Sequence, residues 1–246
     1  MAFSFRRLTY RKRVIQAALT GKQNVHFLHI RKTGGTTLKT ILSQHLVTDR
    51  CVLHLHPHRV RLRHVANGHR IMFVTRDPVS RFVSGFGSRQ RQGAPAHIVP
   101  WNEAETKAFG IFSTANELAL ALDPAHPLHA EAVDAMHHIS HLQCSYWDWF
   151  GDEAALTDRE SSILFIGQIE TFAEDFERLK PVLGLPAETR LPDDPVTTNR
   201  SPRAASGPAL SDEALALVRH WYRSDYQFLD FCHRWREKNQ GPVAAC

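Results

Sequence analysis

The sequence predicts an α/β fold with a central parallel sheet and helices on both of its faces. Short apolar runs occur at residues 25–30, 51–56, 71–75 and 162–167, and each has the length of a buried strand. Stretches with helical spacing of apolar residues separate these runs. Strands that alternate with helices are typical of parallel βαβ units, in which the helices cover the sheet.

The first half of the chain supplies three of the four strands. A glycine turn follows the run at 25–30, and a helix is predicted from about residue 36 to residue 46. Pro57 ends the second strand, a short helix is expected over 58–65, and Pro78 suits the first turn of a helix after the third strand. The right-handed crossover of such units predicts that the carboxyl ends of neighbouring strands share one edge of the sheet.

The second half is predicted to be mainly helical. Residues 90–158 show helical patterns that Pro124 and Pro127 interrupt, and their aromatic residues are expected in the core or in an acceptor pocket. Thr171 and Glu174 form a capping-box pattern before an apolar helical stripe, and helices are expected over 211–236. The proline-rich, polar stretch 186–208 is predicted to be a long loop, and loops of this length are often functional.

Length and composition indicate one enzyme-sized domain. With 246 residues, 43% of them hydrophobic and 22% charged, the chain can bury a substantial core. We predict a basic N-terminal segment at 1–23, a single domain over 24–236 and a C-terminal tail at 237–246. The net charge of +5 is compatible with an anionic cofactor, an anionic substrate or a membrane surface. The recognised nucleic-acid-binding patterns are absent, so we expect no nucleic-acid partner.

The cysteine pattern and the N-terminus bear on the compartment. The four cysteines have no Cys-x-x-Cys spacing, which favours free thiols in a reducing compartment. The first residues lack the apolar core of a signal peptide, and no apolar run reaches the length of about 18 residues that a membrane span needs. We therefore expect a cytoplasmic protein. Residues 6–19 read as a short basic amphipathic helix that either packs on the domain or lies on an anionic membrane.

The stretch from Asn24 to Leu38 predicts an anion-binding loop. A buried strand, a tight turn and a helix start direct free backbone N–H groups and the positive end of a helix dipole into one small space. Lys32 adds a cation, and Gly34 and Gly35 allow the backbone to come close to a ligand. Hydroxyl donors follow at Thr36 and Thr37.

An ordinary strand–turn–helix connection also contains glycines and a threonine, so the loop alone leaves that alternative open. The loop differs from the usual nucleoside-triphosphate signature, because its lysine precedes the glycines and no Gly-Lys-Ser/Thr follows.

A second motif, from Ile71 to Phe86, favours the anion-binding alternative. Arg76 follows the third predicted strand, and Arg81 and Ser84 are neighbours on one face of the next helix. Arg76 and Ser84 are expected to converge on one phosphate. The alternative is that Asp77 caps the helix and that the arginines are solvated.

Together these two motifs resemble the sulfotransferases that use 3′-phosphoadenosine 5′-phosphosulfate (PAPS). The resemblance is to the carbohydrate group that contains the heparan sulfate 2-O-sulfotransferases and their bacterial relatives, and it covers about residues 24 to 230. It implies a P-loop-like three-layer α/β/α fold, a first loop that binds the 5′-phosphosulfate and a second element that binds the 3′-phosphate. Weaker similarities lie at 165–170, 199–201 and 221–228. The cofactor-binding residues implied are Arg31, Lys32, Thr33, Gly34, Gly35, Thr36, Thr37, Arg76, Arg81, Ser84, Asn199, Arg200 and Ser201.

Sulfuryl transfer also needs a base that activates the acceptor hydroxyl, and histidine suits that task. The run His54-Leu-His-Pro-His58 ends the second strand, and related carbohydrate sulfotransferases carry a base histidine in a His-x-His element at a similar place. His54 and His56 share one face of a strand. We predict His56 as the base and His54 as the second choice, with Lys32 as the charge that stabilises the leaving phosphate.

A metal site is the competing explanation of the histidines, and His137 with His141 has helical ligand spacing. No His-Glu-x-x-His pattern and no nearby cysteine supports it, so we predict no metal.

The sequence thus predicts a PAPS-dependent sulfotransferase whose acceptor is a hydroxyl group, on a glycan by resemblance or on a small molecule. Two other functions remain open. One is a nucleotide-dependent kinase with the same anion-binding loop, and the other is an inactive nucleotide- or glycan-binding protein. The acceptor, the sulfated position and the oligomeric state do not follow from the sequence.

Overall fold

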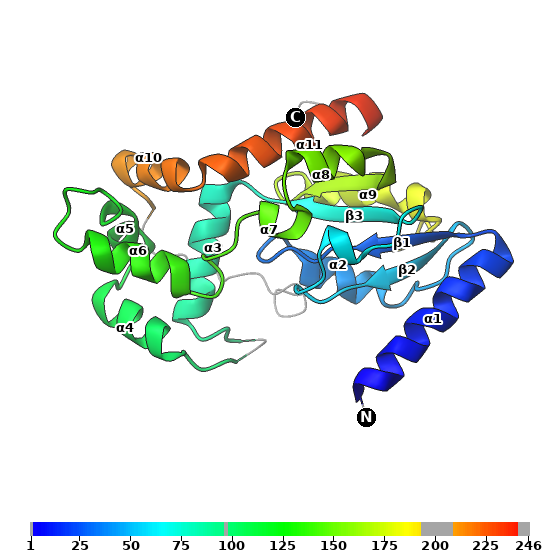
Figure 1. The fold of residues 1–246 in the computed structure, drawn as a ribbon, viewed down its shortest axis with the longest axis horizontal. Helices are drawn as coiled ribbons and strands as arrows, with labels where there is room; N and C mark the ends of the chain where they lie inside the picture. The colour runs from blue at the N-terminus through cyan, green and yellow to red at the C-terminus, as the bar shows by residue number, and fades with distance from the viewer. Residues whose placement is uncertain (1, 96–97, 193–208, 241–246) are drawn as a thin grey trace. The chain divides into compact units, whose positions relative to one another are not determined.

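The structure is a computed structural model that describes residues 2–95, 98–192 and 209–240, with side chains from residue 10 onward. The chain forms two compact units, and each is built from separate segments (Figure 1). Unit 1 comprises residues 1–75, 148–192 and 232–246, and unit 2 comprises residues 76–147 and 193–231.

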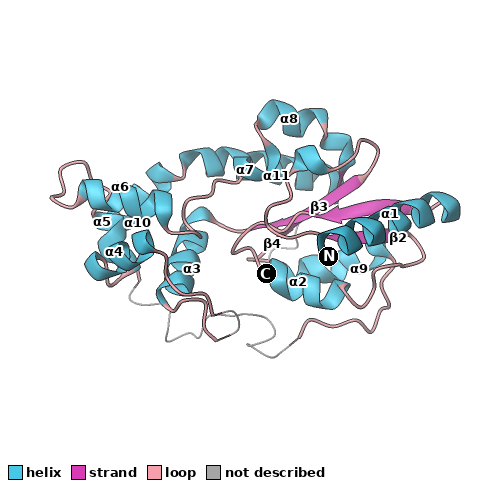
Figure 2. Ribbon diagram, turned by 60° about the horizontal axis from the view of Figure 1, so that its bottom comes forward, coloured by secondary structure: helices cyan, strands magenta, loops and turns pink. Residues whose placement is uncertain are grey.

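Unit 1 contains a parallel sheet. In the described residues its strands are β1 (Gln23–Phe27), β2 (Cys51–Leu55), β3 (Arg70–Thr75) and β4 (Ile163–Gln168), in the order β2-β1-β3-β4. All three pairings are parallel, with His26 opposite His54 and Ile71. Figure 2 shows these strands in magenta among the helices. The predicted central parallel sheet and its four strand positions are therefore confirmed.

Helices cover both faces of this sheet, which confirms the three-layer α/β/α fold. On one face Val25, Phe27 and Leu53 pack against α2 (Gly35–Leu42) and α9 (Phe172–Leu183). Side chains alternate along a strand, so His26 and His54 point to the opposite face. There they contact Tyr10 of α1 (Ala2–Thr20). The other short elements of this unit are η1 (Leu62–His64), α7 (Trp147–Phe150), α8 (Glu153–Asp158) and η2 (Glu160–Ser162).

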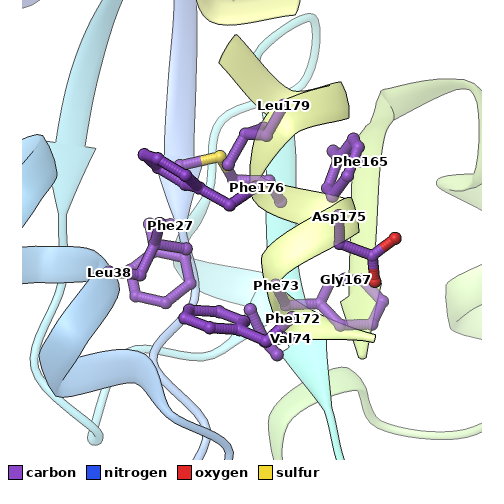
Figure 3. A pocket seen from close by; sticks show the side chains of 11 residues that line it. Phe27, Leu38, Phe73, Val74, Phe165, Gly167, Phe172, Asp175, Phe176 and Leu179 are labelled. Carbon is purple, nitrogen blue, oxygen red and sulfur yellow. The ribbon is translucent and has the colours of Figure 1, made fainter. Parts of the chain in front are cut away.

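The core between the sheet and α9 is closely packed. Figure 3 shows a small gap there, lined mainly by aromatic and aliphatic side chains that include Phe27, Phe165 and Phe176. Its volume of about 10 Å³ is too small for a ligand, and Asp175 is the one charged residue among the side chains that line it. A gap of this size is therefore not a candidate substrate site.

Unit 2 is helical in its described residues. It contains α3 (Pro78–Gln90), α4 (Glu103–Ile111), α5 (Ala115–Leu120), α6 (His129–His138) and α10 (Asp212–Trp221), together with the first half of α11 (Arg223–Gln240). Phe82, Phe86 and Phe112 are fully buried in its core. The aromatic residues of the segment 90–158 were predicted to lie in the core or in an acceptor pocket. A core position is confirmed for Phe112, and Phe109 packs against the same cluster.

Several element boundaries differ from the predictions. The first strand is Gln23–Phe27, not Val25–Ile30, although the amide of Leu28 still donates to the carbonyl oxygen of Met72 at 3.0 Å and the turn before α2 begins only at Arg31. The short helix expected over 58–65 is a single 3-10 turn, and residues 237–240 of the predicted tail continue α11. The single domain over 24–236 stays a prediction. Among the described residues, no helix combines the length and apolar character that a bilayer crossing requires.

Candidate functional site

The loop between β1 and α2 has an unusual backbone. Lys32 has a φ of 65°, in the left-handed region that residues other than glycine rarely adopt, and Gly34 follows with a φ of 74°. No side chain of the described residues caps the N-terminus of α2, which begins at Gly35. Such strained loops cluster at ligand sites, and successive N–H groups in this geometry form anion-binding concavities.

Both glycines of the loop are required by their surroundings. A Cβ atom on Gly35 would lie 2.2 Å from Cδ2 of His29, and one on Gly34 would lie 2.5 Å from Cδ1 of Ile169. His29 is buried, stacks on Phe27 and lies with its ring centroid 3.9 Å from that of His58. The loop backbone therefore packs closely against the side chains of His29 and Ile169, and its binding of an anion stays a prediction.

The remaining predicted loop residues divide into two groups. Arg31, Lys32 and Thr36 are half-buried, while Thr33 and Thr37 are buried. The hydroxyl of Thr33 donates to the carbonyl oxygen of Ile30 at 3.2 Å, so it shapes the loop itself.

His54, the second-choice base, lies inside unit 1. Only 3% of it is exposed, and its Nε2 lies 2.8 Å from Oδ1 of Asn24. Its ring packs against Tyr10 of α1 and stacks on His26. Burial lowers the pKa of His54 to about 4, so its ring is neutral near neutral pH. An acceptor has little access to this side chain.

His56, the first-choice base, belongs to a hydrogen-bonded line of imidazoles. Its Nε2 lies 2.8 Å from Nδ1 of His26, whose Nε2 lies 2.9 Å from Nδ1 of His69. Burial lowers the pKa of His56 to about 4, and the charge of Lys39 acts in the same direction. Burial, together with the neighbouring histidines, lowers the pKa of His26 to about 2. These rings are therefore neutral near neutral pH.

His58 is a third candidate base, which the sequence reasoning passed over. Its Nδ1 lies 2.8 Å from the carbonyl oxygen of His29, which can only accept, so Nδ1 carries the proton and Nε2 has the lone pair. Burial lowers the pKa of His58 to about 4, and Arg31 and Lys32 of the loop and Lys39 of α2 act in the same direction. The sequence signal that could have pointed to His58 was the alternating histidine run from His54 to His58. The strand ends at Leu55, so strand alternation says nothing about His58.

The second motif forms the beginning of α3 in unit 2. Asp77 caps this helix through a 2.8 Å bond from the amide of Ser80, and Pro78 occupies its first turn. The Nε of Arg76 donates to the hydroxyl of Ser80 at 2.8 Å. Ser84 is half-buried one turn further along the helix, on the same face as Ser80. The helix-cap alternative for Asp77 is thus observed, and Arg76 remains beside the hydroxyl-bearing face of α3.

The structure corrects the position of Arg81. Only 2% of Arg81 is exposed, and its guanidinium pairs with the fully buried Asp225. The ring of Tyr146 lies 4.4 Å from the guanidinium carbon. An arginine is expected at the surface unless a partner compensates its charge, and Asp225 provides that partner. We therefore remove Arg81 from the cofactor-binding residues.

Other predicted residues are not located. Asn199, Arg200 and Ser201 lie outside the described residues. Within the described part of the chain, no group of three histidine, cysteine, aspartate or glutamate side chains has the geometry of a metal site.

A comparison with known protein families matches residues 16–232 to the sulfotransferase family. The chain belongs to the sulfotransferase family. The match includes the loop after β1, the strand-end histidines and the start of α3. A search of curated proteins gave no match. As a sulfotransferase, the protein transfers a sulfuryl group.

Proposed function

We propose that this sulfotransferase uses PAPS as the donor and a hydroxyl group, on a carbohydrate, as the acceptor. The carbohydrate preference rests on the resemblance to the heparan sulfate 2-O-sulfotransferase group. The observation that carries the proposal is the loop after β1, with its left-handed Lys32 and the close approach of Gly35 to His29. A loop of this kind suits an anion that binds to backbone N–H groups.

The two phosphate groups of the donor are assigned separately. We assign its 5′-phosphosulfate to Lys32 and the loop amides, with Arg31 nearby and with hydroxyls at Thr36 and Thr37. Its 3′-phosphate is assigned to Arg76 and Ser84. By the same resemblance, three further residues are proposed to bind the nucleotide, namely Asn199, Arg200 and Ser201.

Catalysis requires that the acceptor oxygen forms a bond to sulfur while the bond from sulfur to the 5′-phosphate oxygen breaks. A base takes the hydroxyl proton, and the departing phosphate keeps the electron pair. We propose His58 ahead of His56 as this base for two reasons. Arg31 and Lys32 of the loop lower the pKa of His58, so its ring lies near these cations, and its Nδ1 is held by the carbonyl oxygen of His29. Lys32 would stabilise the negative charge that builds on the phosphate.

The two rival functions are less well supported. A kinase normally carries a Gly-Lys-Ser/Thr loop, and the chain has none. An inactive nucleotide- or glycan-binding protein would not require a neutral imidazole whose tautomer is fixed beside the loop cations.

Calorimetric titration tests the donor assignment. The protein should bind 3′-phosphoadenosine 5′-phosphate about tenfold to a hundredfold more tightly than 5′-AMP, ATP or NAD, because charge-assisted hydrogen bonds to the 3′-phosphate contribute about 1.5–3 kcal/mol. Arg76→Ala should abolish most of the difference from 5′-AMP. Arg91→Ala, at the other end of α3, should preserve it. Equal affinities of the native protein for the bisphosphate and 5′-AMP would contradict the assignment.

A further inference from the structure

A single side chain holds the backbone of Arg76 on both sides. The hydroxyl of Tyr146 donates to the carbonyl oxygen of Arg76 at 2.5 Å and accepts from its amide N–H at 2.9 Å. A phenol has one donor and can accept at the same time, so both bonds form together. Tyr146 is fully buried, so water does not replace these bonds. The backbone direction at Arg76 is thereby fixed just where the chain leaves β3.

Tyr146 is itself held by Asp225 of α11. The carboxylate of Asp225 accepts from the amide of Tyr146 at 2.9 Å and from the hydroxyl of Ser145 at 2.5 Å, and it also pairs with Arg81. The Tyr146 ring is stacked on Phe228, with centroids 4.9 Å apart and planes 13° from parallel. Asp225 is completely buried. This network leaves the Tyr146 ring little freedom to move.

The side chain of Arg76 has an anchor as well, since its Nε donates to the hydroxyl of Ser80. Asp77, the cap of α3, accepts from the hydroxyl of Tyr226 at 3.1 Å, which fixes the helix start. The backbone of Arg76 is therefore held by Tyr146 from the segment before α7, and its side chain is held by Ser80 of α3.

We infer that Tyr146, held by Asp225, is a positioning residue that fixes Arg76 for recognition of a 3′-phosphate on a nucleotide. This inference rests on the proposed function, because that proposal assigns the 3′-phosphate to Arg76. Arginine binds a phosphate through a planar fork, so affinity depends on its orientation as well as on its charge. A loosely held Arg76 loses that geometry. Arg81, which sequence reasoning placed at the phosphate, serves in the support of Tyr146 instead.

Tyr146→Phe tests the inference, because it removes the hydroxyl and keeps the ring on Phe228. Calorimetry is done on the full chain with 3′-phosphoadenosine 5′-phosphate and with 5′-AMP. The loss of the hydrogen bonds to Arg76 is expected to lower the affinity for 3′-phosphoadenosine 5′-phosphate about fivefold to tenfold. The affinity for 5′-AMP, which has no 3′-phosphate, should stay within about twofold of native, so the ratio of the two affinities falls.

Tyr222→Phe is the matched control. Tyr222 is also buried in unit 2 and near Arg81, but its hydroxyl donates to the carbonyl oxygen of Leu142 at 2.9 Å. Its loss should leave the affinity ratio unchanged. Ser80→Ala, which removes the side-chain anchor of Arg76, should lower the ratio, and it provides the test if Tyr146→Phe does not fold in a thermal-denaturation check.

The outcomes separate this inference from the proposed function. A native protein without a preference for the bisphosphate contradicts the proposed function. A native preference that Tyr146→Phe retains in full overturns the inference alone. The inference is also overturned if Tyr146→Phe weakens both nucleotides equally, because that result indicates a purely structural role.

Discussion

Gly35→Ala is expected to disable the loop after β1, and the structure gives the size of the effect. The new Cβ would lie 2.2 Å from Cδ2 and 2.5 Å from Nε2 of His29. Carbon atoms in ordinary contact are about 3.5–4.0 Å apart, so the overlap exceeds about 1 Å. His29 is only 6% exposed and is packed between Phe27 and His58, so it cannot swing into solvent.

Overpacking of this kind costs about 1–3 kcal/mol. If the strain is relieved by displacing the loop amides, the affinity for 3′-phosphoadenosine 5′-phosphate should fall about fivefold to 150-fold, at about 1.4 kcal/mol for each factor of ten. Calorimetry measures the affinity, and thermal denaturation shows how much of the cost appears as lost stability.

A double-mutant cycle with His29→Ala isolates the clash. The double variant Gly35→Ala/His29→Ala has room for the new methyl group, so it should bind the nucleotide better than the sum of the two single effects predicts. Gly110→Ala in the last turn of α4 is the control, because no described atom apart from its chain neighbours and the backbone of its own helix lies within 4 Å of its Cβ position, and alanine favours a helix over glycine. Native nucleotide affinity and native stability in Gly35→Ala would refute the reasoning.

Three further predictions concern charge and protons. Lys32→Ala should lower turnover at saturating donor more than it lowers nucleotide affinity, and normal turnover would show that Lys32 only docks the anion. His58→Ala should bind 3′-phosphoadenosine 5′-phosphate normally yet lose about 10²–10⁴-fold in turnover, and a fully active variant moves the role to His56, then to His54. Folding lowers the pKa of His54, His56 and His58 from 6.5 to about 4, so the unfolded chain binds more protons below about pH 6.5. The unfolding free energy, measured by denaturant titration, should therefore fall on acidification from about pH 7 to about pH 5. The expected slope is about 1.4 kcal/mol per pH unit for each additional proton that the unfolded chain binds. An unfolding free energy that does not change with pH would contradict the burial of these rings.

The sheet could be predicted because its signals are local. Each strand is a short apolar run bounded by turn residues, and its position was found to within a few residues. The loop after β1 was predicted from two glycines and a lysine in sequence. Its close contact between Gly35 and His29 was beyond prediction, because it depends on the direction in which a buried ring packs.

The role of Arg81 could not be predicted, because its partner is distant in the chain. Helical spacing places Arg81 one turn from Ser84, and an arginine there is expected to face solvent or a ligand. The structure instead pairs it with Asp225, 144 residues away. Tyr146 is separated from Arg76 by 70 residues, and no periodicity relates the two. Interactions of this kind depend on how helices pack in unit 2, which local patterns do not encode.

In the loop region the histidines are neutral, and the positive charge comes from the basic residues. Burial keeps the rings of His56 and His58 neutral near neutral pH, so they contribute no charge to anion binding. The positive charge that acts on His58 comes from Arg31, Lys32 and Lys39. A neutral imidazole can accept a proton, whereas an imidazolium cannot. In the proposed function these cations would therefore favour the protonation state that a base needs, and they would also attract the donor's phosphates. The same arrangement makes His58 a weak base in the free protein. The negative charge of a bound donor would raise its pKa, so that it becomes a stronger base only when the donor is present.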